Sequence, residues 1–244
     1  FFSKILNADI RIQALMALGL TVWIIYTTDH LLDAGKIHVK ASTIRHRFHQ
    51  KNFHILFGLT LTALLADIVF VLYLRPAVLK AGVILGLLVC IYLIANKTLR
   101  SMKEIAGALF YPSGVGMPAL VLSGADLNTF VILLIIQFMI TAWINMLLFS
   151  LFDTENDKAD QRISFATVMG KPFTSRLLVA LFVICLGLAC YQLIAGLDWA
   201  VIIVAFMDIT LLAIFLFEKY FKTGDRYRLA GDAVFLFPLF YLFA

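Results

Sequence analysis

The chain has 244 residues, of which 62% are apolar and 14% charged, and its formal net charge is +5. Soluble domains carry roughly 25% charged residues, so this composition excludes an ordinary soluble domain and is typical of a membrane protein. A helix that crosses the hydrocarbon core needs about 20 mostly apolar residues. Eight stretches of this kind follow one another: 10–28, 53–74, 77–95, 105–123, 128–151, 174–195, 199–217 and 230–244. We therefore predict an all-α, polytopic membrane bundle, and the long apolar runs argue against a transmembrane barrel.

The connections between these spans predict the topology. Those after spans one, three, five and seven are long and hold 16 of the 20 lysines and arginines. Because cytoplasmic loops are enriched in Lys and Arg, we expect these four loops in the cytoplasm, where they can also attract anionic lipid headgroups. We expect no nucleic-acid partner, since the sequence shows no basic helix or aromatic–basic platform outside the spans.

Two pairs of aspartates close two of the spans. Asp29 and Asp33 end the first span, and Asp153 and Asp157 end the fifth, so both pairs share one side of the membrane and the spacing of four that puts them on one helix face. Paired carboxylates repel, and Mg²⁺ suits them because it binds one or two carboxylates together with substrate phosphate oxygens. Two facing pairs would clamp a diphosphate through magnesium ions; the alternative is ordinary charged helix ends. Asp160 is either a further metal ligand or a solvated charge.

The motifs around these pairs resemble the UbiA superfamily of intramembrane prenyltransferases over nearly the whole chain. The resemblance rests on "IYTTDHLLD" (25–33), "YLIANKTLRSMKEIAGALFYPSGVGMPAL" (92–120), "DTENDKADQRISFATVMGK" (153–171) and "YRLAGDAVFLFPLF" (227–240). The family's first motif is commonly NDxxDxxxD, and here Ile25 and Tyr26 replace its Asn-Asp. The resemblance implies one prenyltransferase-like domain, residues 1–244, around a central cavity. Family members usually have nine helices, to which these eight would correspond as helices two to nine.

The two aspartate pairs are offset by the same number of residues, which suggests an internal four-helix repeat, about 1–125 and 126–244.

The resemblance also implies an activity: Mg²⁺-dependent transfer of a prenyl group from a polyprenyl diphosphate to an aromatic or other lipophilic acceptor, as in quinone biosynthesis. The expected location is a multi-pass position in a bacterial inner membrane with a cytoplasmic active site. Cyclisation of the prenyl diphosphate without an acceptor is an alternative within the family. Cation transport is an alternative from another class, because Asp67 and Asp208 lie inside predicted spans. Such acids shape a pocket, pair with a neighbouring helix or are protonated.

Further residues are candidates for binding the substrate. The family places a lysine in the middle loop and often an arginine after the first motif, which implies phosphate-binding roles for basic residues there, and for two that follow the second motif. Positive-inside anchoring explains the same residues. Two tyrosines that flank the middle loop are candidates to stabilise a carbocation with their ring faces, or belong to an interfacial belt. The candidates are Lys97, Arg100, Arg45, Lys158, Arg162, Tyr92 and Tyr111.

Histidines crowd the stretch around the first aspartate pair: His30, His38, His46, His49 and His54. Their spacing includes HRFH but no HExxH motif and no cysteine partners, which argues against a zinc site. We expect a solvated loop that faces the headgroups.

Overall fold

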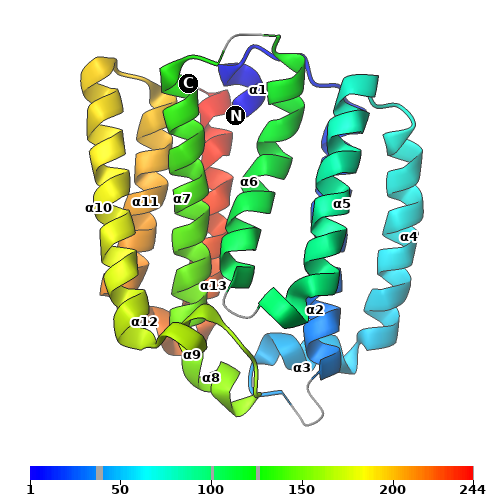
Figure 1. The fold of residues 1–244 in the computed structure, drawn as a ribbon, viewed down its shortest axis with the longest axis vertical. Helices are drawn as coiled ribbons and strands as arrows, with labels where there is room; N and C mark the ends of the chain where they lie inside the picture. The colour runs from blue at the N-terminus through cyan, green and yellow to red at the C-terminus, as the bar shows by residue number, and fades with distance from the viewer. Residues whose placement is uncertain (37–40, 100–101, 125–126, 244) are drawn as a thin grey trace.

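The computed structural model describes residues 1–36, 41–99, 102–124 and 127–243. This part of the chain is helical and has no strand. It contains seven α-helices that are long and apolar enough to cross a membrane, and Figure 1 shows them packed side by side in a bundle. The structure confirms the predicted all-α, polytopic bundle. The seven helices are α2 (Ile12–Lys36), α4 (Phe53–Val71), α5 (Pro76–Leu99), α6 (Lys103–Leu122), α7 (Thr129–Phe152), α10 (Lys171–Ala195) and α11 (Trp199–Leu216).

The eighth predicted span differs from the other seven. It begins earlier than expected, as α13 (Arg226–Ala233), and continues as a 3₁₀-helix, η3 (Val234–Leu242). Pro238 lies inside η3 and has no backbone N–H to donate, which disfavours a regular α-helix there. The segment packs against α11 and α7 and runs from the lower end of Figure 1 to the upper end, where the C-terminus lies.

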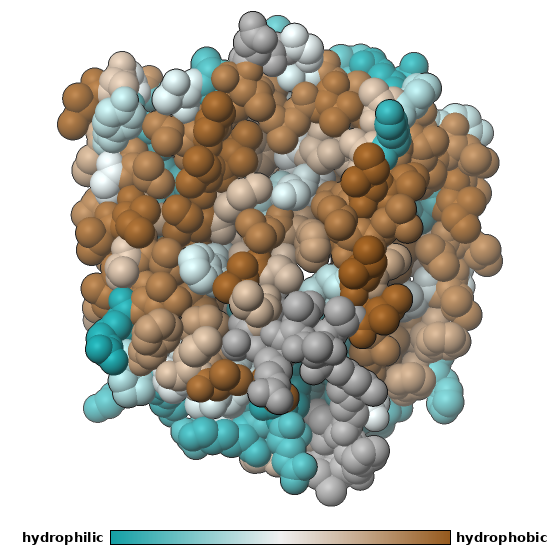
Figure 2. All heavy atoms as spheres, viewed as in Figure 1, coloured by the Kyte–Doolittle hydropathy of each residue, from teal (hydrophilic) through white to brown (hydrophobic). Residues whose placement is uncertain are grey.

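Short helices gather at the two ends of the bundle. The N-terminal α1 (Phe2–Ile5) lies at the upper end of Figure 1 with both termini. The lower end carries α3 (Ile44–Lys51), α8 (Thr154–Ala159), α9 (Phe165–Met169), α12 (Glu218–Lys222) and the 3₁₀-turn η2 (Thr223–Asp225). The loops predicted to be basic therefore meet at one end. Figure 2 shows apolar residues over the height of the long helices and hydrophilic ones at the two ends.

The segment after the first span was predicted wrongly. It contains a basic helix, α3, whose start is capped by the Thr43 hydroxyl that accepts from the His46 backbone N–H. Its side chains His46 and His49 are buried against the bundle instead of facing solvent. A solvated loop is therefore wrong for these two histidines; His54 is exposed at the start of α4, and His38 lies outside the described residues.

The core is built around α7. Its buried side chains pack against α6, α10 and α11, and they include Gln137 and Thr141. Asp208 on α11 accepts hydrogen bonds from Gln137 Nε2 at 2.9 Å and from Thr141 Oγ1 at 2.6 Å. Gln192 on α10 donates to Gln137 Oε1 at 3.0 Å. This network joins three helices, because a polar side chain inside a bilayer requires a partner.

The other deep acid has a similar role. Asp67 on α4 accepts a hydrogen bond from the Thr21 hydroxyl on α2 at 2.8 Å. Of the roles left open for Asp67 and Asp208, the structure shows pairing with a neighbouring helix.

Close contact with α7 fixes the position of α13. A Cβ atom on Gly231 would lie 2.5 Å from Asn145 Oδ1 and 2.8 Å from the Phe149 ring. Only glycine fits this contact without a shift of the two helices. The contact lies about one helical turn from Tyr227 and Arg228, which lie nearer the lower end of the bundle.

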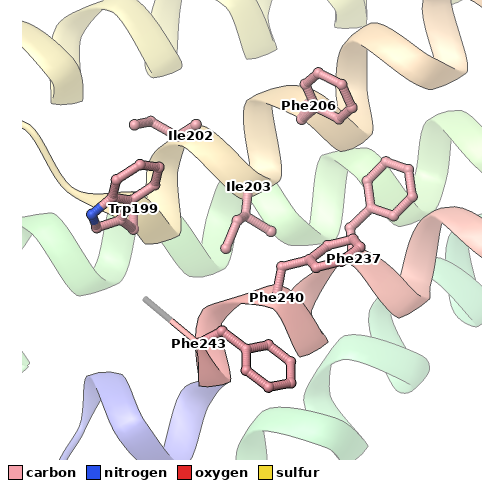
Figure 3. A pocket seen from close by; sticks show the side chains of 7 residues that line it. All are labelled: Trp199, Ile202, Ile203, Phe206, Phe237, Phe240 and Phe243. Atoms are coloured by element: carbon pink, nitrogen blue, oxygen red, sulfur yellow. The ribbon is translucent and has the colours of Figure 1, made fainter.

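A surface pocket of about 540 Å³ lies between α11 and η3. Figure 3 shows its aromatic and aliphatic side chains around an open space. They come from the start of α11 and the end of η3, so the pocket lies toward the end of the bundle opposite α8 and α9. Its lining is Trp199, Ile202, Ile203, Phe206, Phe237, Phe240 and Phe243.

Candidate functional site

The two aspartate pairs lie at the same end of the bundle. Asp29 and Asp33 belong to the last turns of α2, Asp153 follows the last residue of α7, and Asp157 lies in α8. Asp33, Asp153 and Asp157 are only 7%, 3% and 5% exposed, and Asp29 is half-buried. Ordinary charged helix ends would be solvated. Burial of three carboxylates instead requires compensating cations or hydrogen bonds.

Arg162 joins the two pairs. Its Nη2 forms an ion pair with Asp33, and its Nη1 lies 3.2 Å from Asp157 Oδ1. The Arg162 backbone N–H also donates to the Asp157 carbonyl at 2.7 Å, which folds the chain back after α8. One guanidinium thus holds one carboxylate from each pair, although the two motifs lie far apart in sequence.

Asp153 is held by α13 instead. The Tyr227 hydroxyl donates to Asp153 Oδ1, and the Arg228 guanidinium forms an ion pair with Asp153 Oδ2. That guanidinium also lies over the rings of Phe149 and Tyr227, at 5.1 and 5.4 Å from their centroids. Sequence reasoning treated Arg228 only as a topology signal. The only sequence signal for this contact was that Tyr227 and Arg228 are adjacent at the start of the last span.

Arg45 and the histidines form a layer behind the first pair. Arg45 Nη1 donates to His30 Nε2 at 3.0 Å, so the His30 proton is on Nδ1, which lies 4.0 Å from Asp29 Oδ2. His49 Nδ1 donates to the Arg45 carbonyl at 2.9 Å and its ring centroid lies 5.1 Å from that of His30. The layer brings a third arginine to the site.

His46 is fully buried beside this layer. Its Nδ1 lies 2.7 Å from the Thr43 hydroxyl. Burial, and then the positive charges of Arg162 and Arg45, lower the pKa of His46 to about 3, so it is neutral at physiological pH. Among the described residues, no three histidine, cysteine, aspartate or glutamate side chains lie so that they could hold one metal ion together.

The remaining charged candidates either lie apart from these carboxylates or fall outside the residues that the structure describes. Asp160 accepts from the Ser42 backbone N–H at 2.9 Å and from its hydroxyl at 2.7 Å, so it ties the loop before α3 to the end of α8. Lys158 is exposed. The side chain of Lys97 and the whole of Arg100 lie outside the described residues.

The two candidate tyrosines lie in the interior of the bundle. Tyr92 on α5 is half-buried, with its ring centroid 5.7 Å from that of Phe110. Tyr111 on α6 is also half-buried and packs edge-on against Phe235 at 5.2 Å. Each ring thus packs against a neighbouring helix.

Two residues that the sequence did not indicate position the loop that carries Arg162. Glu104 on α6 accepts from the Phe165 backbone N–H at 2.8 Å, and Ser150 on α7 accepts from the Ala166 N–H at 2.9 Å. These are the first backbone donors of α9, which a helix leaves unpaired unless side chains satisfy them. The loop between α8 and α9 is therefore fastened to the bundle at its second end.

The four aspartates suit a hard divalent cation. Their carboxylate oxygens are ligands that Mg²⁺ prefers, and Mg²⁺ completes its coordination with water and phosphate oxygens. The Arg162 bridge shows that a cationic group fits between Asp33 and Asp157.

Solved structures with this architecture decide the fold. A UbiA homologue from Archaeoglobus fulgidus, bound to GPP and Mg²⁺, matches 95% of this chain and 89% of its own with a TM-score of 0.67 and 13% identity. A structure of a UbiA homologue from Archaeoglobus fulgidus bound to DMAPP and Mg²⁺ matches with a TM-score of 0.64 and 13% identity. The match again covers 95% of this chain and 89% of the homologue's chain. This chain has the UbiA fold. No family model matches the sequence, and none of the curated proteins does.

Proposed function

We propose that this protein is a UbiA-type prenyltransferase that binds a prenyl diphosphate with Mg²⁺ at its four aspartates. The observation that carries the proposal is the meeting of two buried aspartate pairs at one end of a bundle with the UbiA fold. The two solved structures with this fold hold GPP or DMAPP together with Mg²⁺. The ion pairs from Arg162 to Asp33 and Asp157 support it, because they join the pairs into one site.

In this proposal Asp29, Asp33, Asp153 and Asp157 hold the metal, which when bound supplies positive charge to the departing diphosphate. Arg162 and Arg45 add positive charge at the same end, where guanidinium groups match phosphate oxygens in pairs. Further members of this anion site are the earlier candidates Lys97, Arg100 and Lys158, with Asp160 as a supporting acid.

The reaction follows from this placement of charge. The bond between the allylic carbon and the diphosphate oxygen breaks, and its electron pair leaves with the diphosphate. A lipophilic acceptor then forms a bond to the allylic carbon and loses a proton. Tyr92 and Tyr111 present aromatic rings in the interior and would stabilise the allylic cation by their π faces.

The location and the acceptor belong to the same proposal. We propose a cytoplasmic site in a bacterial inner membrane, and the basic loops at this end of the bundle support the cytoplasmic side. An aromatic acceptor of the kind used in quinone biosynthesis suits a site at the end of a membrane bundle. We also propose that residues 1–244 act as one domain built on a four-helix repeat.

Diphosphate release tests this function. The purified protein in lipid nanodiscs is incubated with GPP or DMAPP, with Mg²⁺ or EDTA, and with or without a lipid extract as acceptor source. We expect Mg²⁺-dependent release that Asp33→Asn and Asp157→Asn abolish. Asp9→Asn is the matched control, because Asp9 is exposed and pairs with Arg75 away from the site.

The lipid extract separates the two reactions open to this fold. Release that requires the extract supports transfer to an acceptor, whereas equal release without it supports cyclisation. No release under any condition contradicts the proposal.

A further inference from the structure

Three of the four site carboxylates already have guanidinium partners. Arg162 pairs with Asp33 and Asp157, and Arg228 pairs with Asp153. These two side chains are only 13% and 15% exposed, so the pairs are largely removed from water. The site thus neutralises its aspartates with cations of its own.

The two arginines differ in how they are held. Arg228 projects from α13, lies over two aromatic rings and shares Asp153 with the Tyr227 hydroxyl. Arg162 projects from the loop between α8 and α9, directly after Gln161, whose φ of 52° lies in the left-handed region. The Arg162 guanidinium contacts the carboxylates of Asp33 and Asp157. Arg228 is therefore fixed by packing, whereas Arg162 is fixed by the aspartates.

A divalent cation and the Arg162 guanidinium compete for the same carboxylates. Two positive groups a few ångströms apart repel, most strongly where burial weakens solvent screening. A metal ion that enters alone would also find few ligands, since no three metal-binding side chains converge in the described part of the chain. A diphosphate removes both obstacles, because it supplies oxygen ligands to the metal and an anionic partner of matching shape to the guanidinium.

We propose that Arg162 is an exchangeable counter-ion, which holds Asp33 and Asp157 in the unliganded protein and transfers to the diphosphate when metal and diphosphate bind. This inference rests on the proposed function. It makes Arg162 the residue that couples metal binding to diphosphate binding, so that the metal alone binds weakly.

Equilibrium dialysis with Mn²⁺ tests the exchange on the full chain in nanodiscs. Protein-bound Mn²⁺ is measured with the ion alone and with inorganic diphosphate, and the soluble Mn²⁺–diphosphate complex is counted separately. For the wild type we expect diphosphate to tighten Mn²⁺ binding by about tenfold or more. Arg162→Gln should bind Mn²⁺ alone about tenfold more tightly than the wild type, because the repelling charge is gone.

Two further variants show that the effect belongs to the charge at this position. Arg162→Lys keeps the charge and should bind Mn²⁺ alone as weakly as the wild type. Arg176→Gln removes a guanidinium that hydrogen-bonds only within α10 and should also behave as the wild type. If Arg162→Gln binds Mn²⁺ alone no more tightly than the wild type, or if Arg162→Lys binds it as tightly as Arg162→Gln, the inference is wrong.

The two failures can be told apart. Absence of Mn²⁺–diphosphate binding in every form of the protein contradicts the proposed function, whereas the comparison of Mn²⁺ alone still decides the role of Arg162. The wild-type comparison with and without diphosphate needs no variant, so it can overturn the inference even if Arg162→Gln does not fold. Equal Mn²⁺ affinity in those two wild-type arms, with diphosphate shown to be bound in the same dialysis, overturns it.

Discussion

His46 should make the fold sensitive to mild acid. It is fully buried, its Nδ1 contacts the Thr43 hydroxyl, and burial with the charges of Arg162 and Arg45 lowers its pKa to about 3. In the unfolded chain a histidine has a pKa of about 6.5. Between these two values the unfolded state binds the extra proton and the folded state does not. Stability is therefore complete above pH 6.5 and falls as the pH drops below it.

The size of the effect follows from the two pKa values. At pH 5.5 an unfolded His46 is about ten-elevenths protonated while the folded one stays neutral, which costs about 1.4 kcal/mol of unfolding free energy relative to high pH. For a chain of this length, about 1.4 kcal/mol corresponds to roughly 3–6 °C in Tm.

The assay is thermal unfolding in detergent at pH 7.5 and 5.5, for the wild type and for His46→Asn. Asparagine keeps a polar group near Thr43 but has no proton to gain. We expect the wild type to lose about 1.4 kcal/mol more than His46→Asn between the two pH values. Equal losses would refute the assignment of His46 as a buried neutral histidine.

Two predictions concern packing and the buried polar network. Gly231→Ala should destabilise the fold by about 1–3 kcal/mol, because the added Cβ meets α7 at 2.5 Å, whereas Gly187→Ala, with nothing within 4 Å, should be neutral or slightly stabilising; equal Tm values would contradict the close contact. Thr141→Val should cost about 1–3 kcal/mol in thermal unfolding, because Asp208 loses a donor at 2.6 Å. Thr210→Val, whose hydroxyl bonds only its own exposed helix, should have little effect, and a similar loss in both would count against the network.

The fold was largely predictable because hydrophobic length is a strong signal in a membrane chain. Seven predicted spans correspond to α-helices, with boundaries that differ by a few residues. The last segment is just as apolar, but apolarity does not distinguish an α-helix from α13 followed by η3. Helix α3 was missed because its side chains are polar, and polar residues between spans resemble a loop until tertiary contacts bury them.

The meeting of the two aspartate pairs at one end of the bundle was predictable, whereas their side-chain partners were not. A repeated i, i+4 spacing at two helix ends is local information, so Asp29, Asp33, Asp153 and Asp157 could be read from the sequence. The contacts of Arg228 and Glu104 join segments far apart in the chain. From residue type alone, each would be read as a membrane anchor or a solvated charge. Their partners are set by the packing of α13 and α9 against the bundle.

The most direct test of the central claim is the binding of GPP to the full chain in nanodiscs, measured with Mg²⁺ and with EDTA. The account predicts saturable binding that needs Mg²⁺ and is lost in Asp157→Asn, while Asp9→Asn binds as the wild type does. Binding that is unaffected by EDTA and by Asp157→Asn, or absent altogether in the wild type, would contradict it.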